Sequence, residues 1–132
     1  MYHELYLPFP PTVNNYYKKS AHGGRYISQK GRLFRAQVAE AVIDQIGDSV
    51  PLDYQMLVEV ILFPPDNRTR DVDNYNKALL DAISETGFWL DDKFIDQLFV
   101  YRGEVRSRRG SCYVRISEAA PILRSPDQLP ED

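Results

Sequence analysis

Four aspartates and one lysine lie close enough in the chain to form one site. Asp71 and Asp73 are two residues apart, so in an extended backbone their side chains leave the same face. Asp91 and Asp92 form a second acidic pair, and Lys77 lies one helical turn after Asp73. Carboxylates held close together repel unless one keeps its proton or a cation joins them. The pattern therefore predicts a metal site for Mg²⁺, with Mn²⁺ as a substitute, because hard cations take carboxylate and water oxygens.

A lysine beside such a metal site indicates phosphate chemistry. Its ammonium group can neutralise charge that develops on a phosphate, or orient an attacking water, and the combination suits phosphodiester hydrolysis. Each residue also has an ordinary structural interpretation. Asp73 would then only cap a helix, Lys77 and Asp81 would only form a surface pair, and Asp91 and Asp92 would only form a polar turn. The set is more specific than any of its members because all of them occur around one helix-sized segment.

A short helix between the two acidic pairs is expected to position them. Apolar residues recur at helical spacing between Tyr75 and Ile83, with Asp73 as a good N-cap and Gly87 as a good residue to end the helix. The apolar run 88–90 then supplies an anchor that would bring the second acidic pair back toward the first.

The other elements predict an α+β fold, a single domain with the order β-α-β-α-β-β, a small mixed sheet and flanking helices. Strands are expected at 2–7, at 54–63 in the centre of the sheet, at 94–102 and at 112–116, with a basic hairpin over 102–110. A helix is expected from Ser28, its N-cap, to about Ile46, with Gly47 at its end. This single domain would cover 1–117, and 118–132 would form a loosely ordered acidic tail.

Composition favours a single cytoplasmic domain. The chain has 132 residues and one cysteine, Cys112, which excludes an internal disulfide and makes a structural zinc site unexpected. The most apolar run, 56–65, is too short to span a bilayer, and the amino terminus has no basic, apolar leader. We therefore expect no membrane partner.

Basic residues gather in patches despite a net charge of -3. Residues 118–132 hold four acids and one base, so 1–117 hold 15 of each; without the four site aspartates this body carries +4. Such patches can follow phosphates, or can be ordinary solvated surface. The candidate DNA-binding residues are Lys18, Lys19, Arg25, Arg68, Arg70 and Arg102. In the loop 14–26, Tyr16 or Tyr17 would stack on an unpaired base.

The acidic stretch resembles the signature of the RusA family of four-way (Holliday) junction resolvases. That signature is an arginine-rich run, D-x-D-N-x-x-K and a helix ending in G-x-x-x-D-D, matched here by Arg68, Arg70, Asp71, Asp73, Asn74, Lys77, Gly87, Asp91 and Asp92. The opening segment 7–17 and the start of the first long helix, 27–35, are also similar, so the likeness spans about 5–117. It differs at Arg102, where members often carry a lysine, and the tail beyond Ser117 has no counterpart.

The resemblance implies a small homodimeric, Mg²⁺-dependent endonuclease of bacteria or their phages that cuts branched DNA in recombination and repair. Its catalytic carboxylates would fall on Asp71, Asp73 and Asp92, and its catalytic lysine on Lys77, with Asp91 assisting at the metal. Two symmetric cuts fit a two-fold dimer, for which Phe88, Trp89 or Leu80 would supply the surface. Two alternatives stay open: a metal-dependent nuclease for flaps or forks, and a non-catalytic dimeric DNA-binding module.

Overall fold

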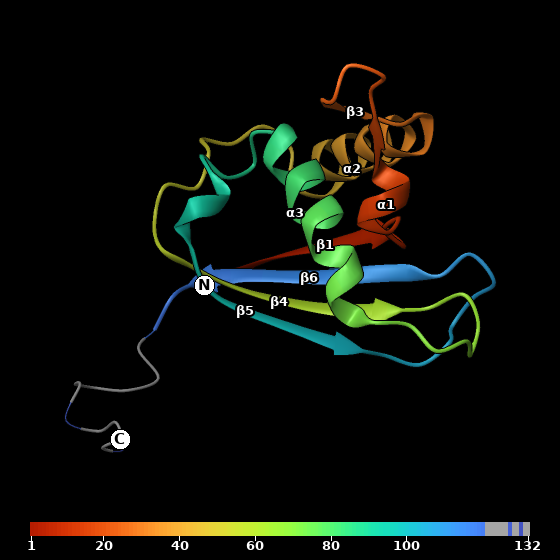
Figure 1. Cartoon of the computed structure of the whole chain (residues 1–132). Coiled ribbons are helices and arrows are strands. Elements are labelled where there is room, and N and C mark those ends of the chain that lie inside the picture. Colours follow the sequence, from red (N-terminus) through yellow and green to blue (C-terminus); the bar gives the residue numbers. More distant parts are fainter. Residues whose placement is uncertain (121–126, 128–129, 131–132) are drawn as a thin grey trace.

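A four-stranded mixed sheet forms the base of the molecule (Figure 1). The computed structural model describes residues 1–120, 127 and 130. The strands are β1 (Tyr2–Pro8), β4 (Met56–Phe63), β5 (Ile95–Arg102) and β6 (Ser111–Glu118), in the spatial order β1-β6-β4-β5. β4 and β5 run parallel, whereas β6 is antiparallel to both β1 and β4. The predicted α+β fold with one mixed sheet is confirmed.

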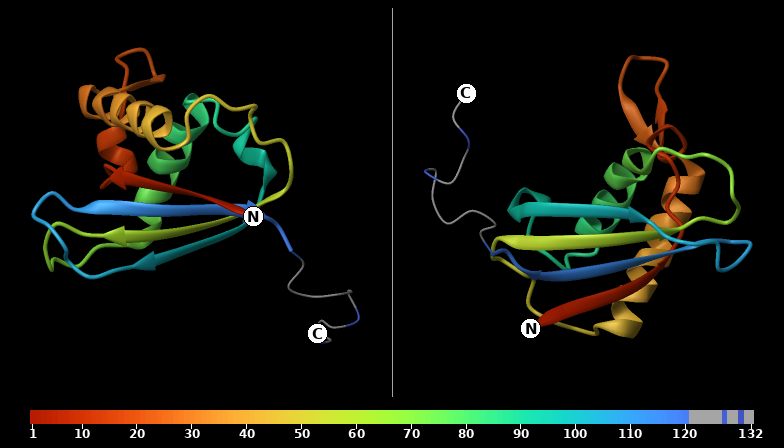
Figure 2. Two further views of the ribbon diagram at one scale, coloured as in Figure 1. Left: turned by 180° about the vertical axis from the view of Figure 1, so that it is seen from behind. Right: turned by 90° about the horizontal axis from the view of Figure 1, so that it is seen from below.

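Two helices cover one face of this sheet and leave the other open (Figures 1 and 2). They are α2 (Gln29–Gln45) and α3 (Asn76–Glu85). Ser28 caps α2 as predicted, because its hydroxyl accepts a hydrogen bond from the Gly31 amide at 3.0 Å. Gly47 and Gly87 follow the two helices with φ of 81° and 76°, the left-handed conformation that lets a chain leave a helix without a Cβ clash.

The core lies between the helices and the central strands. Alternate residues of β4, from Met56 to Leu62, are buried beneath the helices, together with the matching residues of β6. Phe88 and Trp89 belong to this core, with 3% and 1% of their surface exposed, and the indole nitrogen of Trp89 donates to the Ser84 hydroxyl at 2.7 Å. Leu80 is partly buried against the same core. The predicted dimer surface is therefore wrong for Phe88 and Trp89, whose side chains the monomer core already uses, whereas for Leu80 it stays a prediction.

Segment 102–110 is a crossover connection and not the predicted hairpin. β5 lies at the edge of the sheet, and the chain passes over β4 to place β6 between β1 and β4. Cys112, Val114 and Ile116 are buried beneath the helices in this position, while β6 pairs with β1 on one side and β4 on the other.

Segment 14–26 is more ordered than a plain loop. It contains the single turn α1 (Val13–Tyr16) and a two-stranded hairpin of β2 (Tyr17–Lys19) and β3 (Arg25–Ile27). The Thr12 hydroxyl caps α1. These elements are too short to give a periodic pattern, so the sequence did not predict them.

A turn of 3₁₀ helix, η1 (Val72–Tyr75), precedes α3, and a second, η2 (Asp92–Phe94), precedes β5. Asp73 lies inside η1 and is not the predicted N-cap of α3, which begins only at Asn76. Val72 and Tyr75 explain the early turn: both pack on the core, and residues three apart share one face of a 3₁₀ helix. The extended geometry expected for Asp71 and Asp73 therefore ends at Asp71.

Among the described residues, no helix is long and apolar enough to cross a membrane. Most of the predicted acidic tail, 118–132, lies outside the described residues, so its order stays a prediction.

Candidate active site

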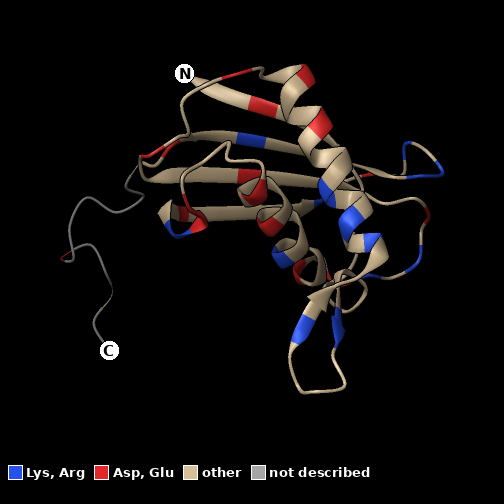
Figure 3. Cartoon of the chain, turned by 90° about the horizontal axis from the view of Figure 1, so that it is seen from above, with Lys and Arg blue, Asp and Glu red and all other residues tan. Residues whose placement is uncertain are grey.

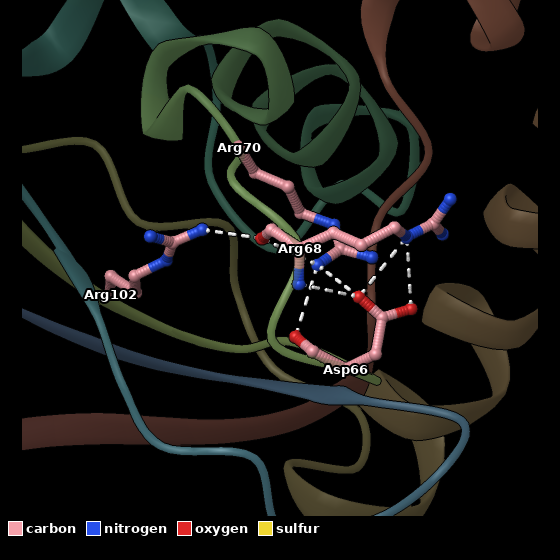
Figure 4. A network of polar contacts seen from close by, with 4 residues as sticks. All are labelled: Asp66, Arg68, Arg70 and Arg102. Carbon is pink, nitrogen blue, oxygen red and sulfur yellow. Dashed lines mark hydrogen bonds and ion pairs between the residues drawn. The ribbon is translucent and has the colours of Figure 1, made fainter.

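An arginine-rich loop is organised by one carboxylate, that of Asp66 (Figure 4). Asp66 accepts hydrogen bonds from the backbone amide of Arg68 at 3.0 Å and its Nε at 3.2 Å, and it pairs with Arg70 at 2.8 Å. The hydrogen bond from Arg70, followed by those from Arg68, holds the pKa of Asp66 well below its usual range. The carboxylate therefore stays charged and fixes both guanidinium groups.

Arg102 joins this loop from the neighbouring strand. Leu62 and Arg102 are partners in the parallel pair β4 and β5, so both strands end at the same edge of the sheet. The guanidinium of Arg102 donates to the carbonyl oxygen of Arg68 at 3.0 Å. The structure thus brings together Arg68, Arg70 and Arg102, the three predicted DNA-binding arginines of this part of the chain. The carboxyl ends of parallel strands are frequent ligand sites.

Asp71 and Asp73 follow this loop directly and are exposed. The backbone turn starts at Asp71, whose carbonyl accepts a hydrogen bond from the Asn74 amide at 3.2 Å. Lys77 is exposed in the first turn of α3. Its Nζ lies 6.0 Å from the centre of the Tyr17 ring, within the range of a cation–π contact.

The pKa of Asp92 depends on three effects: burial, the neighbouring Asp91 and the charge of Lys77. Burial, followed by the hydrogen bond and charge of Asp91, raises the pKa of Asp92, whereas the charge of Lys77 lowers it. Asp91 is partly engaged, because its carboxylate caps η2 by accepting from the Lys93 amide at 2.9 Å. The polar-turn interpretation of Asp91 therefore has structural support.

The two acidic pairs do not form one cluster in the single chain. The described residues contain no group of three or more His, Cys, Asp or Glu side chains that could hold a metal ion. η2 nevertheless packs beside α3, and the charge of Lys77, which follows Asp73 by one helical turn, lowers the pKa of Asp92. Phe88 and Trp89 anchor the segment 88–90 in the core, whereas Leu90 is exposed. That Asp92 shares a cation with Asp71 and Asp73 stays a prediction.

The β2–β3 hairpin carries three further predicted DNA-binding residues, Lys18, Lys19 and Arg25, and all are exposed. The Arg25 guanidinium lies 4.7 Å from the centre of the Tyr17 ring. Tyr16 cannot stack on a base as predicted, because it is fully buried and its hydroxyl points to α3.

A polar network beside Lys77 was not predicted. The Tyr16 hydroxyl donates to the Asp81 carboxylate at 2.7 Å, and Arg35 pairs with the same carboxylate oxygen at 2.8 Å. The predicted surface pair of Lys77 with Asp81 is wrong, since Asp81 turns to α2 instead. In the sequence, apolar neighbours flank both Arg35 and Asp81, which is a weak sign that the two side chains are partly buried. No local pattern indicates that two residues 46 positions apart form a pair.

Most basic residues lie toward one end of the molecule and most acids toward the other, apart from the acids of the candidate site (Figure 3). Lysines and arginines gather on the β2–β3 hairpin, the first turns of α2 and the loops 64–71 and 103–110, while most acids lie toward the other end. α2 has no acid in its first turn and no base in its last, opposite to the preference of the helix dipole. This arrangement raises the positive potential at one end, which favours an anionic partner.

A small α+β domain with exposed carboxylates beside clustered lysines and arginines has the features of a protein that processes nucleic acid. The family model described as "Endodeoxyribonuclease RusA" matches residues 8–117. The chain therefore belongs to the RusA family of endodeoxyribonucleases, as its resemblance implied.

Curated relatives agree with this assignment. The crossover junction endodeoxyribonuclease of enterobacteria phage HK97 is 34% identical over 120 residues, which cover 91% of this chain and 98% of the relative. The protein of the same name from enterobacteria phage 82 is 38% identical over 91 residues, or 69% of this chain and 73% of the relative. That of Escherichia coli K12 is 36% identical over 90 residues, covering 68% and 73%.

Proposed function

We propose that this chain is a divalent-cation-dependent endonuclease that resolves four-way DNA junctions by paired phosphodiester cuts, in recombination and repair. One observation carries the proposal beyond family membership. Arg68, Arg70 and Arg102 are held together immediately before the exposed carboxylates of Asp71 and Asp73. A phosphate bound by these arginines would lie next to the carboxylates.

The carboxylate oxygens of Asp71 and Asp73 are the type of ligand that a hard cation prefers. Mg²⁺ commonly takes one or two carboxylates and completes its shell with waters and substrate phosphate oxygens. A cation bound there would supply activation of a water and stabilisation of the departing oxygen. The described residues contain no ready group of three side chains that could hold a metal ion, so a cation shared by Asp71, Asp73 and Asp92 would have to draw these carboxylates closer together.

Lys77 would supply the positive charge that the scissile phosphate needs as its charge grows. Arg68, Arg70 and Arg102 would fix the register of the backbone, and Lys18, Lys19 and Arg25 of the hairpin would hold a neighbouring strand. Because the hairpin borders Lys77 through Tyr17, both groups can act on one DNA molecule.

Resolution of a junction needs two matched cuts, which a two-fold homodimer provides. We infer that a second copy packs on the open face of the sheet. This face carries a self-complementary set: exposed aromatic residues, Tyr2, Tyr6, Phe99 and Tyr101, surround an ion pair between Glu59 and Arg115. Tyr6 and Tyr101 expose 63% and 53% of their surface. A Tyr101→Asp variant should elute as a monomer while the wild type elutes as a dimer; a dimeric variant would remove this face from the interface.

Cleavage of a synthetic four-way junction during an Mg²⁺ titration tests the proposed activity. We expect nicks in opposed strands only when the cation is present, and little cutting of flap or linear duplex DNA. Preferred cutting of flaps would instead assign the alternative branched substrate. Junction binding without cleavage at any cation concentration would assign the non-catalytic module.

The variant Asp73→Asn tests the carboxylates directly. It removes a charged ligand but keeps the shape of the side chain, so we expect junction binding to persist and cation-dependent cleavage to fall by at least about 100-fold, the scale of a lost electrostatic group in catalysis. Cleavage at the wild-type rate would exclude Asp73 from the reaction.

A further inference from the structure

Asp81 is the acid that Lys77 would normally meet. The two residues are four positions apart on α3, so they lie one turn apart on the same side of the helix. Opposite charges at this spacing usually pair, and a paired Lys77 would be less available to a phosphate. In the structure, however, Asp81 faces α2 and the segment that precedes β2.

Two side chains from outside α3 hold the Asp81 carboxylate. Tyr16 donates its hydroxyl hydrogen to Asp81 Oδ2 at 2.7 Å, and Arg35 Nη2 lies 2.8 Å from the same oxygen. Arg35 Nε also donates to the Tyr16 hydroxyl oxygen at 2.6 Å, which closes a three-membered network. The Arg35 and Asp81 side chains are 28% and 30% exposed, so water competes little for the pair.

The network keeps the Asp81 carboxylate charged and engaged in hydrogen bonds with Arg35 and Tyr16. Burial alone would raise the pKa of Asp81, but the hydrogen bonds from Arg35 and Tyr16 outweigh burial, and the pKa is lowered. Glu85 lies 3.6 Å from Arg35 as a second, weaker partner. Arg35 therefore binds two carboxylates of α3, those of Asp81 and Glu85.

Lys77 forms no direct ion pair in the described part of the chain, although its charge lowers the pKa of Asp92. None of the ion pairs found among residues 1–120 involves its ammonium group. The Lys77 Nζ instead lies over the face of the Tyr17 ring, 6.0 Å from the ring centre. An aromatic face favours the charged ammonium but offers no oxygen that would compete with a phosphate.

We propose that Arg35 is a positioning residue that withholds Asp81 from Lys77, so that the Lys77 ammonium stays free for the scissile phosphate. The inference rests on the proposed function only for the role of Lys77. A plain structural brace between α2 and α3 is the competing explanation of the same contacts, and it makes a different prediction for the double variant described next.

The test compares Arg35→Gln, Asp81→Asn and the double variant, with Lys30→Gln as a control that removes one positive charge from the same helix. Arg35→Gln should release Asp81 to Lys77 and slow junction cleavage about 3- to 10-fold, somewhat above the effect of an exposed helix pair because the site is part-buried. Its junction affinity should fall no more than that of the control. The double variant has no acid to release, so its cleavage rate should return to within about twofold of Asp81→Asn.

A spectrum of the lysine ammonium groups provides a readout that does not depend on activity. The ¹H–¹⁵N signal of Lys77, assigned by its loss in Lys77→Ala, should shift in Arg35→Gln because an ion pair forms, and should return in the double variant. If the wild type cuts no branched DNA, the proposed function fails, while this shift still tests whether Arg35 controls Asp81.

Three results would overturn the proposal: a double variant as slow as Arg35→Gln, an Arg35→Gln enzyme as fast as the control, or an unshifted Lys77 signal. If Arg35→Gln fails to fold, Tyr16→Phe replaces it, since it removes one partner of Asp81 and keeps the buried ring. Its slower cleavage should likewise be restored by Asp81→Asn, and absence of that rescue counts against the proposal.

Discussion

Gly31 in α2 should resist replacement by alanine, although alanine is the better helix former. A Cβ atom at this position would lie 2.6 Å from the carbonyl oxygen of Tyr16 and 2.8 Å from Cγ2 of Ile27. The nearest atom belongs to the backbone and cannot rotate away. That carbonyl also accepts the Ser28 amide at 2.9 Å, which fixes it further. Gly31→Ala must therefore push α2 away from the Tyr16 segment.

The magnitudes determine the sign of the effect. Alanine gains at most about 1 kcal/mol over glycine in a helix, while an extra methyl group in a tightly packed contact costs about 1–3 kcal/mol. Because the nearest atom is backbone, the cost should lie in the upper part of this range, about 2–3 kcal/mol, and after the helix gain we expect Gly31→Ala to lower the free energy of unfolding by about 1–2 kcal/mol. Urea unfolding can be followed by the fluorescence of Trp89, the single and buried tryptophan.

Ala36→Gly in the same helix is the matched control. Ala36 is exposed, so this change reports helix propensity alone, with an expected loss of about 1 kcal/mol. A Gly31→Ala protein that is as stable as the wild type, or more so, would refute the argument that α2 needs close contact with Tyr16.

Two further predictions concern α3. Lys77→Ala should slow junction cleavage by at least about tenfold while weakening junction binding by less than about threefold, because the lysine charge acts mainly on the transition state. Parallel cleavage and gel-shift assays measure the two effects, and equal losses in rate and affinity would contradict the prediction. The pKa of Asp81 is lowered in the folded state, so the charged carboxylate stabilises the fold. This contribution to the free energy of unfolding is fully present above the ordinary pKa of a free carboxyl and is lost as pH falls through the lowered pKa. Urea unfolding of wild type and Asp81→Asn should therefore differ most near neutral pH and converge below about pH 4; a difference that grows with acid would show the sign to be wrong.

The sequence predicted the main elements well because their signals are local. Ser28, Gly47 and Gly87 mark helix ends through their own backbone or side-chain chemistry, and the structure places them there. β4 was recognisable as a central strand because both of its faces are apolar. The family signature was equally local, being a fixed spacing of charged residues around one helix.

Long-range relations could not be predicted in the same way. The position of Asp92 relative to Asp71 depends on the parallel pairing of β4 with β5 and on the way the chain returns beside α3 before β5, and neither has a local signal. The capture of Asp81 by Arg35 depends on how α2 packs on α3, and neither residue signals the other. Periodicity also failed at η1, where the burial of Val72 and Tyr75 overrides the capping preference of Asp73.

The central place of β6 bears on how the chain reaches its native state. β6 is the last of the described strands, yet β1 and β4 both depend on it, with Tyr2 paired to Ser117 across 115 positions. Such remote pairings slow folding because a long loop must close before any contact forms. During synthesis, the helices and the β4–α3–β5 unit can assemble on the ribosome, whereas the first strand has to wait until nearly the whole domain has emerged.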